Sequence, residues 1–168
     1  MDQDRGQVMI RKAAEEDARQ IAEIIVEDWK TAYRGIIDSA YLDSMSVEQR
    51  YQREAQRYRQ YMVASDENEV LGFIWNEMTG VEAADCEIVA LYVRYTKRRS
   101  GIGRALFRYS VDTFRASGKK RMIVWCLKEN DEARKFYEKM GGKAYKTYNG
   151  PHVKTMHEEI IVNSEEVT

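Results

Sequence analysis

Basic residues and glycines gather in one short stretch of the chain. Arg98, Arg99 and Arg104 surround the pattern Gly101-Ile102-Gly103. Guanidinium groups fork onto phosphate oxygens, and glycines let a ligand oxygen approach the backbone N–H groups because they carry no Cβ atom. The first N–H groups of a helix have no partner inside that helix and lie at the positive end of its dipole. The stretch therefore predicts a phosphate site, although a basic loop with a glycine turn explains the same residues equally well.

A strand and a helix would have to hold this loop. Residues 88–93 are apolar and rich in β-branched and aromatic side chains, which is typical of a buried strand. After the loop, apolar residues recur at helical spacing, at Ile102, Ala105, Leu106 and Tyr109. Leu106 stands where a dinucleotide-binding fingerprint needs its third glycine, and no Gly-Lys-Ser or Gly-Lys-Thr follows at P-loop spacing. The two commonest phosphate motifs are therefore excluded.

Two separate blocks of the sequence resemble one known family. The pattern Arg98-x-x-Gly101-x-Gly103, after a strand and before a helix, resembles the acetyl-CoA-binding motif of the GNAT N-acetyltransferase superfamily. The block from Asn130 to Gly141 is similar to that family's Asn-x-x-Ala-x-x-Phe-Tyr-x-x-x-Gly segment. The chain departs from the usual family residues between the strand and Gly101, at Tyr95, Lys97, Arg99 and Ser100. None of these departures removes a group that acetyl transfer requires.

The hydrophobic periodicity predicts an α/β (α+β) fold in the order βααβββαβαββ. This order matches the family over nearly the whole chain, and the resemblance implies a GNAT-like mixed, mostly antiparallel central sheet flanked by helices. It also implies a bulge in the strand ending near Val93, and a splay between this strand and the one ending near Leu127. At 168 residues we expect one domain, residues 1–168, with a core of about residues 7–162.

Local signals place the ends of the predicted helices. A first helix follows the acidic residues 15–17 and runs to about Tyr33, and Ser46 is placed to cap a second, strongly polar helix that reaches about Arg59. The helix from Gly101 ends near Gly118, and the last one runs from an Asn130 cap to Gly141. The predicted strands are residues 7–13, 61–64, 70–75, 83–93, 122–127, 143–148 and 153–162.

Charge and composition exclude several classes of protein. The chain has 27 basic and 28 acidic residues, so no overall field favours nucleic acid or an anionic membrane. Its apolar runs fall short of the roughly 20 residues that span a bilayer, and no signal-peptide core is present. We therefore expect a cytoplasmic protein. The lone cysteines Cys86 and Cys126 lie in strand-like runs and are interpreted as buried thiols.

The resemblance implies that the chain transfers an acetyl group from acetyl-CoA, a cosubstrate, to a primary amine by direct attack, without a metal. An alkylammonium has a pKa of roughly 10.4, so the amine must lose a proton before it attacks. By family analogy Glu87 is the candidate general base, through a water, and Tyr137 is the general acid for the leaving thiolate. A surface or ion-paired glutamate and a core tyrosine are the simpler explanations of these two residues.

The family's coenzyme site is carried over to the matching positions of this chain. Main-chain groups of Leu91 and Val93 would bind the pantetheine arm, and Asn130 would contact the coenzyme as well as cap its helix. The predicted coenzyme-binding residues are Leu91, Tyr92, Val93, Arg98, Arg99, Ser100, Gly101, Ile102, Gly103, Arg104, Asn130 and Tyr137.

The acceptor site is less defined in the sequence. In the family it is shaped by the segment after the first helix and by the last hairpin, here about residues 29–42 and 145–154. Trp29, Tyr33 and Tyr148 could form an aromatic wall and Asp28 could attract a cationic amine, but ordinary packing and solvated charge explain them as well. The acceptor is a small-molecule, peptide or protein amine, and a homodimer is compatible with the sequence.

Two other functions use the same residues. An acyl-CoA-binding sensor or regulatory module would keep the phosphate site and have no turnover. A nucleic-acid-binding domain would use the basic loop and bind in a salt-sensitive way, but the nearly neutral net charge argues against it.

Overall fold

A seven-stranded sheet forms the centre of the computed structural model, which describes residues 7–79, 84–149 and 156–163, with residues 145–149 and 156–163 described by their backbone alone. The strands are β1 Met9–Lys12, β2 Tyr61–Ser65, β3 Val70–Glu77, β4 Cys86–Val93, β5 Arg121–Leu127, β6 Lys143–Asn149 and β7 Met156–Asn163. Their spatial order is β1-β2-β3-β4-β5-β7-β6. Within the described residues β4 and β5 run parallel, and every other pair of neighbouring strands is antiparallel.

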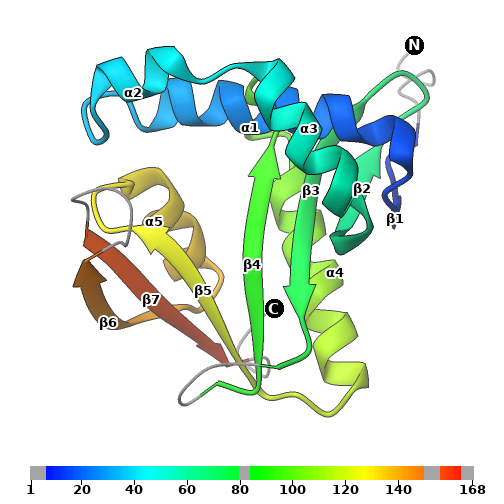
Figure 1. The fold of residues 1–168 in the computed structure, drawn as a ribbon. Coiled ribbons are helices and arrows are strands. Elements are labelled where there is room, and N and C mark those ends of the chain that lie inside the picture. The colour runs from blue at the N-terminus through cyan, green and yellow to red at the C-terminus, as the bar shows by residue number, and fades with distance from the viewer. Residues whose placement is uncertain (1–6, 80–83, 150–155, 164–168) are drawn as a thin grey trace.

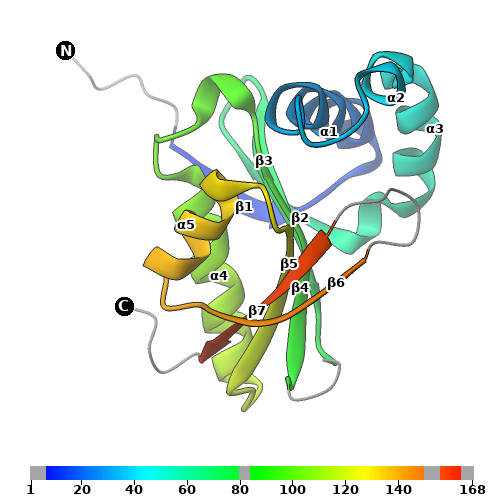
Figure 2. The same cartoon turned by 90° about the vertical axis from the view of Figure 1, so that its left-hand side faces the viewer.

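Helices cover both faces of this sheet. They are α1 Ala18–Ala32, α2 Ser39–Ser44, α3 Val47–Arg57, α4 Ile102–Ala116 and α5 Asp131–Lys139, with short 3₁₀ turns η2 Glu15–Asp17, η3 Tyr58–Gln60 and η4 Tyr95–Lys97. Figures 1 and 2 show α1, α2 and α3 on one face and α4 and α5 on the other. In the described part of the chain, no helix is long and apolar enough to cross a membrane.

The predicted mixed α/β fold and element order are confirmed, with one addition. Helix α2 was not predicted, because it has six residues and buries only Leu42, too little for a hydrophobic period to show. The predicted caps are confirmed: the Ser46 side chain accepts a hydrogen bond from the Gln49 N–H, and Asn130 accepts one from Ala133. The beginning of the last strand, predicted at residue 153, lies outside the described residues.

Strand β4 carries a bulge at the point where it leaves β5. On the β3 side, Ile88 pairs with Asn76 and Ala90 pairs with Trp75, so Val89 is the extra residue. On the β5 side the pairing begins at Cys86 and ends at Ile88, and beyond it the two strands diverge (Figure 1). A bulge bends and twists a strand, so its position accounts for the divergence. The predicted bulge and splay are confirmed.

Helix α4 lies very close to β3 and β4, and Gly72 makes this closeness possible. A Cβ atom at Gly72 would lie 2.6 Å from the Tyr92 carbonyl oxygen and 3.2 Å from side-chain carbons of Ile102 and Leu106. The side chains of Leu106, Phe107 and Phe114 are fully buried beneath the helix. This packing fixes where α4 begins, and therefore where the loop that precedes it lies.

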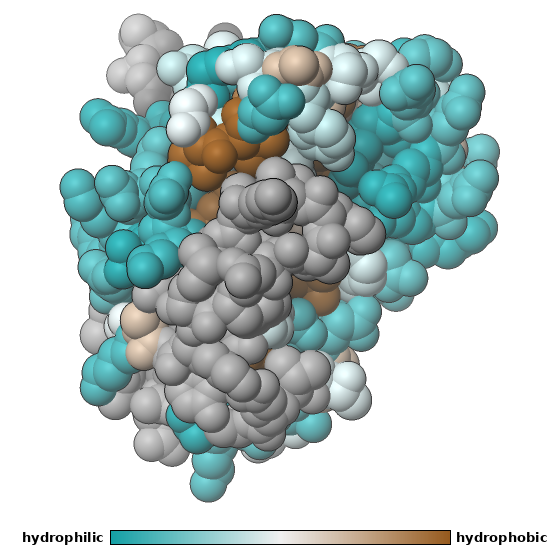
Figure 3. Space-filling model, turned by 60° about the vertical axis from the view of Figure 1, so that its left-hand side comes forward, coloured by the Kyte–Doolittle hydropathy of each residue, from teal (hydrophilic) through white to brown (hydrophobic). Residues whose placement is uncertain are grey.

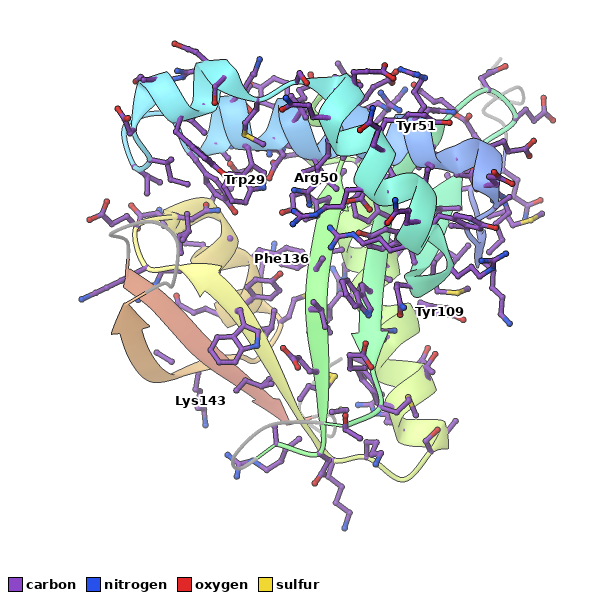
Figure 4. The ribbon with its side chains drawn as sticks, in the orientation of Figure 1. Trp29, Arg50, Tyr51, Tyr109, Phe136 and Lys143 are labelled. Carbon is purple, nitrogen blue, oxygen red and sulfur yellow. The ribbon has the colours of Figure 1, made fainter. Side chains whose placement is uncertain are left out.

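The polar helix α3 contacts the sheet through a buried carboxylate. Glu54 is fully buried and accepts hydrogen bonds from the Tyr61 hydroxyl at 2.6 Å and from the guanidinium groups of Arg50 and Arg57. Figure 4 shows Arg50 on the side of α3 that faces the sheet. The predicted strongly polar helix is confirmed, but the ionic contact beneath it was not predicted. The sequence of this helix contains several charged residues, and it gives no sign that Glu54 is the buried one.

Candidate active site

A cavity of about 890 Å³ lies where β4 and β5 diverge. Its walls come from β4, the loop before α4, β5, α5 and the end of α1. Figure 3 shows hydrophobic side chains recessed among hydrophilic ones on this side of the molecule, and Figure 4 shows the Phe136 ring on the side of α5 that faces β4. The cavity therefore joins the two motifs that the sequence analysis identified.

The loop before α4 presents backbone donors that the fold does not use. Arg99 and Gly101 adopt left-handed backbone conformations, with φ of 62° and 89°, and the first hydrogen bond of the helix runs from the Ala105 N–H to the Gly101 carbonyl. None of the hydrogen bonds among the described residues uses the N–H groups of residues 99–104. Since these donors stand at a helix N-terminus beside a cavity, they form a site that fits a phosphate or diphosphate.

Gly103 keeps the first turn of α4 close to its neighbours. A Cβ atom there would lie 3.4 Å from a Val93 methyl group and 3.7 Å from the Phe136 ring. Gly101 and Gly103 line the cavity, whereas Ile102 points into the core and Ser100 donates its hydroxyl hydrogen bond to the Lys97 carbonyl. Ser100 and Ile102 can therefore contribute to this site through their backbone N–H groups.

The basic residues of the loop have different partners. Arg94 supports the fold, because it donates to the Val70 carbonyl at 2.9 Å and to the Gln20 side chain at 3.1 Å. Arg99 and Arg104 line the cavity and make no ion pair with a described residue. Arg98 also lines it, but its guanidinium group is already paired with carboxylates. Two cations of the loop are thus available to an anionic ligand, and a third would have to exchange partners.

Asp28 and Glu132 are the carboxylates that hold Arg98. Asp28, on α1, forms a hydrogen-bonded ion pair with one guanidinium nitrogen, and Glu132, in the first turn of α5, lies 3.5 Å from another. The Asp28 side chain is 15% exposed and lines the cavity. Burial raises the pKa of Asp28 to about 6, because desolvation outweighs the attraction of Arg98.

Tyr137, from the second motif, lies in the wall of the cavity. The centre of its ring lies 5.3 Å from that of Phe136 and 6.2 Å from that of Phe107, and its side chain is largely buried. Burial, followed by the nearby Cys126, raises the pKa of the Tyr137 phenol well above its ordinary value. The phenol therefore keeps its proton at neutral pH, and none of the described residues forms a hydrogen bond with its hydroxyl.

Glu87 lies at the closed end of the splay. It pairs with Ile123 where β4 and β5 are still joined, and it is absent from the described residues that line the cavity. Its carboxylate accepts a hydrogen bond of 2.5 Å from the Trp125 indole, and Trp125 does line the cavity. A proton transfer from the cavity to Glu87 would have to pass through water, and the observed contact instead orients Trp125.

The remaining predicted coenzyme residues come together. Leu91, Tyr92, Val93 and Asn130 all line the cavity, and on the β5 side the described backbone of residues 89–93 has no strand partner. Other lining residues were not predicted, among them Val89, Ala90, Cys126, Ala133, Lys135, Phe136, Lys139 and Met140. Several of these could have been found, because Ala133, Phe136 and Met140 share one face of α5 with Tyr137.

The predicted acceptor residues are only partly brought together. Asp28 and Tyr33 line the cavity, and burial raises the pKa of the Tyr33 phenol. Trp29 does not line it: this side chain packs edge-on against Tyr33 at 4.9 Å and donates a 3.0 Å hydrogen bond to the Tyr92 hydroxyl. The side chain of Tyr148 lies outside the described residues. Among those described, no group of three or more His, Cys, Asp or Glu side chains could hold a metal ion.

Comparison with known proteins identifies relatives of this chain. The Acetyltransferase (GNAT) family profile matches residues 18–142. The chain is 32% identical to "Uncharacterized N-acetyltransferase YuaI" of Bacillus subtilis over 130 residues, and this match covers 73% of each chain. It is 30% identical over 141 residues to "Probable N-acetyltransferase Rv2775" of Mycobacterium tuberculosis, covering 79% of this chain and 78% of that one.

A solved structure shares the fold. The PaiA N-acetyltransferase of Thermoplasma acidophilum in complex with coenzyme A superposes with a TM-score of 0.73 at 20% identity, over 94% of this chain and 99% of that one. At this identity the likeness supports the architecture alone, whereas the family profile and the relatives in sequence extend over most of the chain. The protein therefore belongs to the GNAT family of acetyltransferases and is an acyltransferase.

Proposed function

We propose that this chain moves an acetyl group from acetyl-CoA to a primary amine by direct attack of the amine on the thioester. The observation that carries the proposal is the row of unused N–H donors of residues 99–104 on the same cavity as Tyr137. Arg99 and Arg104 add positive charge beside these donors. The structural neighbour from Thermoplasma acidophilum was solved with coenzyme A, which supports the same ligand class here.

Tyr137 is the proposed proton donor for the leaving thiolate. A free thiol has a pKa of roughly 8.5, and a phenol that stays protonated at neutral pH can donate to the thiolate as the carbon–sulfur bond breaks. The raised pKa of Tyr137 and its lack of a hydrogen-bond partner among the described residues are both suited to this role.

Glu87 stays the base that the sequence predicts, acting only through water. Its carboxylate is already bonded to Trp125, so this role needs a chain of water molecules that passes the indole. The acceptor side of the cavity carries Asp28 and Tyr33, and we propose that a cationic amine is drawn toward Asp28. The cytoplasmic location and a homodimer likewise stay predictions.

Replacing Tyr137 with phenylalanine tests the function. We expect kcat to fall by roughly a hundredfold, a typical loss for one general acid, while the Kd of acetyl-CoA stays within about twofold. Tyr109→Phe is the matched control, because Tyr109 is a half-buried phenol on α4 that does not line the cavity. Turnover is measured by thiol release with a panel of amines.

The sensor alternative predicts a different pattern. Acetyl-CoA would stabilise an acyl-CoA sensor against thermal unfolding, by roughly 2.7 kcal/mol of unfolding free energy at about 100 times Kd. The sensor would release no thiol with any amine. Absence of any effect of acetyl-CoA on unfolding would overturn both readings.

A further inference from the structure

Arg98 lines the cavity and connects helices from the two faces of the sheet. One guanidinium nitrogen bonds Asp28 of α1, and another lies 3.5 Å from Glu132 of α5. Helices α1 and α5 cover opposite faces (Figure 2), so the arginine reaches one carboxylate from each. The guanidinium carbon also lies 5.1 Å from the centre of the Tyr95 ring. Arg98 is thus held inside the site by groups of the protein, in the same loop that offers unused N–H donors.

A diphosphate bound to these donors would compete with Asp28 for Arg98. Guanidinium groups bind phosphate oxygens and carboxylates through the same forked geometry, so both anions address the same donors. Asp28 lines the cavity and its side chain is 15% exposed, so its carboxylate would be subject to the negative charge of a bound diphosphate. Two anions that share one cavity repel each other, which favours a change of partner for Arg98.

We propose that the coenzyme diphosphate draws Arg98 away from Asp28, and that the released Asp28 carboxylate binds the ammonium group of the acceptor and takes one proton from it. This inference rests on the proposed function; it adds an order of binding and assigns the role of general base to Asp28 in place of Glu87. Coenzyme binds first, since the carboxylate that receives the amine is occupied by Arg98 until then.

The surroundings of Asp28 fit a group that accepts a proton once Arg98 has left. The other charged or titratable groups that act on it are Glu27 on α1, Glu132 on α5 and the phenols of Tyr33, Tyr92 and Tyr137. None of these groups is a cation, so loss of Arg98 strengthens the hold of Asp28 on a proton. Arg99 and Arg104, the other cations of the loop that line the cavity, would remain with the diphosphate.

The proton balance of the reaction requires such an acceptor. An alkylammonium and acetyl-CoA give an amide, free coenzyme A and one proton. Asp28 takes this proton before the attack and releases it to solvent. The nitrogen–carbon bond then forms and the carbon–sulfur bond breaks. Tyr137 gives its proton to the sulfur and recovers the one that nitrogen loses as it becomes an amide.

The Asp28→Asn variant tests the inference through two measurements that should change in opposite directions. The competitor for Arg98 is removed, so acetyl-CoA should bind roughly fivefold or more tightly at pH 8 by calorimetry. The proton acceptor is removed as well, so kcat/KM for the amine should fall by roughly a hundredfold and lose its acidic limb. A variant that misfolds would lose both properties, so the opposite signs separate this role from a structural one.

Two further variants give the comparison. Glu27→Gln removes the neighbouring carboxylate of α1, which does not line the cavity, and both quantities should stay within about twofold. Glu87→Gln should leave the acidic limb of the pH profile in place. If Glu87→Gln removes that limb and Asp28→Asn does not, or if Asp28→Asn binds acetyl-CoA no more tightly, the inference is wrong.

The result for the wild type separates this inference from the proposed function. If the wild type acetylates no amine but Asp28→Asn still binds acetyl-CoA more tightly, the proposed function fails and the competition for Arg98 is supported. If the wild type turns over and Asp28→Asn behaves like it in both measurements, the function stands and the inference is overturned.

Discussion

Replacing Asp28 with asparagine should make the native protein more stable at neutral pH. The pKa of Asp28 is raised from 3.8 to about 6, chiefly because burial disfavours its charged form, even with Arg98 beside it. A shift of roughly two units corresponds to about 3 kcal/mol at about 1.36 kcal/mol per unit. Asparagine carries no charge to desolvate, but it leaves Arg98 with Glu132 alone, so about 3 kcal/mol is an upper limit on the gain.

The direction with pH follows from which state holds the proton more tightly. Between about pH 4 and pH 6 the native protein binds a proton at Asp28 and the unfolded chain has lost it, so wild-type stability falls as pH rises through this window. Asparagine does not titrate. The stability difference between Asp28→Asn and the wild type should therefore be largest above pH 7. Below pH 4 this difference should become small.

Urea unfolding followed by tryptophan fluorescence, at several pH values from 4 to 8, measures this difference. At pH 7.5 the midpoint of thermal unfolding should also rise, by roughly 2–4 °C per kcal/mol for a domain of this size. Glu27→Gln provides the control on the same helix and should change little. A less stable Asp28→Asn protein at pH 7.5, or a difference that does not vary with pH, would refute the reasoning.

Other positions give sharp expectations. Glu54→Gln should destabilise the protein by roughly 3 kcal/mol in urea unfolding, because it leaves the Tyr61 hydroxyl and two arginines around a side chain without charge. Gly72→Ala should cost about 1–3 kcal/mol and weaken acetyl-CoA binding, because the new Cβ would press on the Tyr92 carbonyl and displace β4. Gly101→Ala should cost about 1–2 kcal/mol and weaken acetyl-CoA binding, because φ is 89° there.

Matched variants isolate the cause of each effect. Glu48→Gln removes an exposed glutamate of the same helix as Glu54, in a surface ion pair with Arg19, and should change stability by less than about 1 kcal/mol. Gly118→Ala imposes the same kind of backbone strain at the other end of α4, with φ of 75°, and should leave acetyl-CoA binding unchanged. Equal losses of binding in Gly118→Ala and Gly101→Ala would contradict a specific role for the loop.

The parts of this molecule that sequence could predict are those encoded by neighbouring residues. The loop before α4 and its helix were predicted well, since the apolar strand, the glycines and the helical period occupy one continuous stretch. Asn130 and Ser46 were predicted as caps for the same reason, because each contacts a residue three positions later.

Contacts between distant segments were not predictable in this way. Asp28 and Arg98 are 70 positions apart, and neither residue type announces the other. Sequence analysis therefore placed Asp28 at the acceptor and Arg98 at the coenzyme without recognising that they share a hydrogen bond. The same limit applies to Glu87, whose partner Trp125 lies on the neighbouring strand.

The short seam between β4 and β5 has a mechanical consequence. Only three residue pairs join these strands in the described part of the chain. The loop before α4, with its N–H donors, follows β4, whereas Tyr137 lies on α5, which follows β5. Phe107 provides a second contact between the two sides, since its ring on α4 packs against both Phe136 and Tyr137 on α5. These few contacts set the position of the loop before α4 relative to Tyr137, so a substitution at Phe107, which does not line the cavity, should shift one against the other.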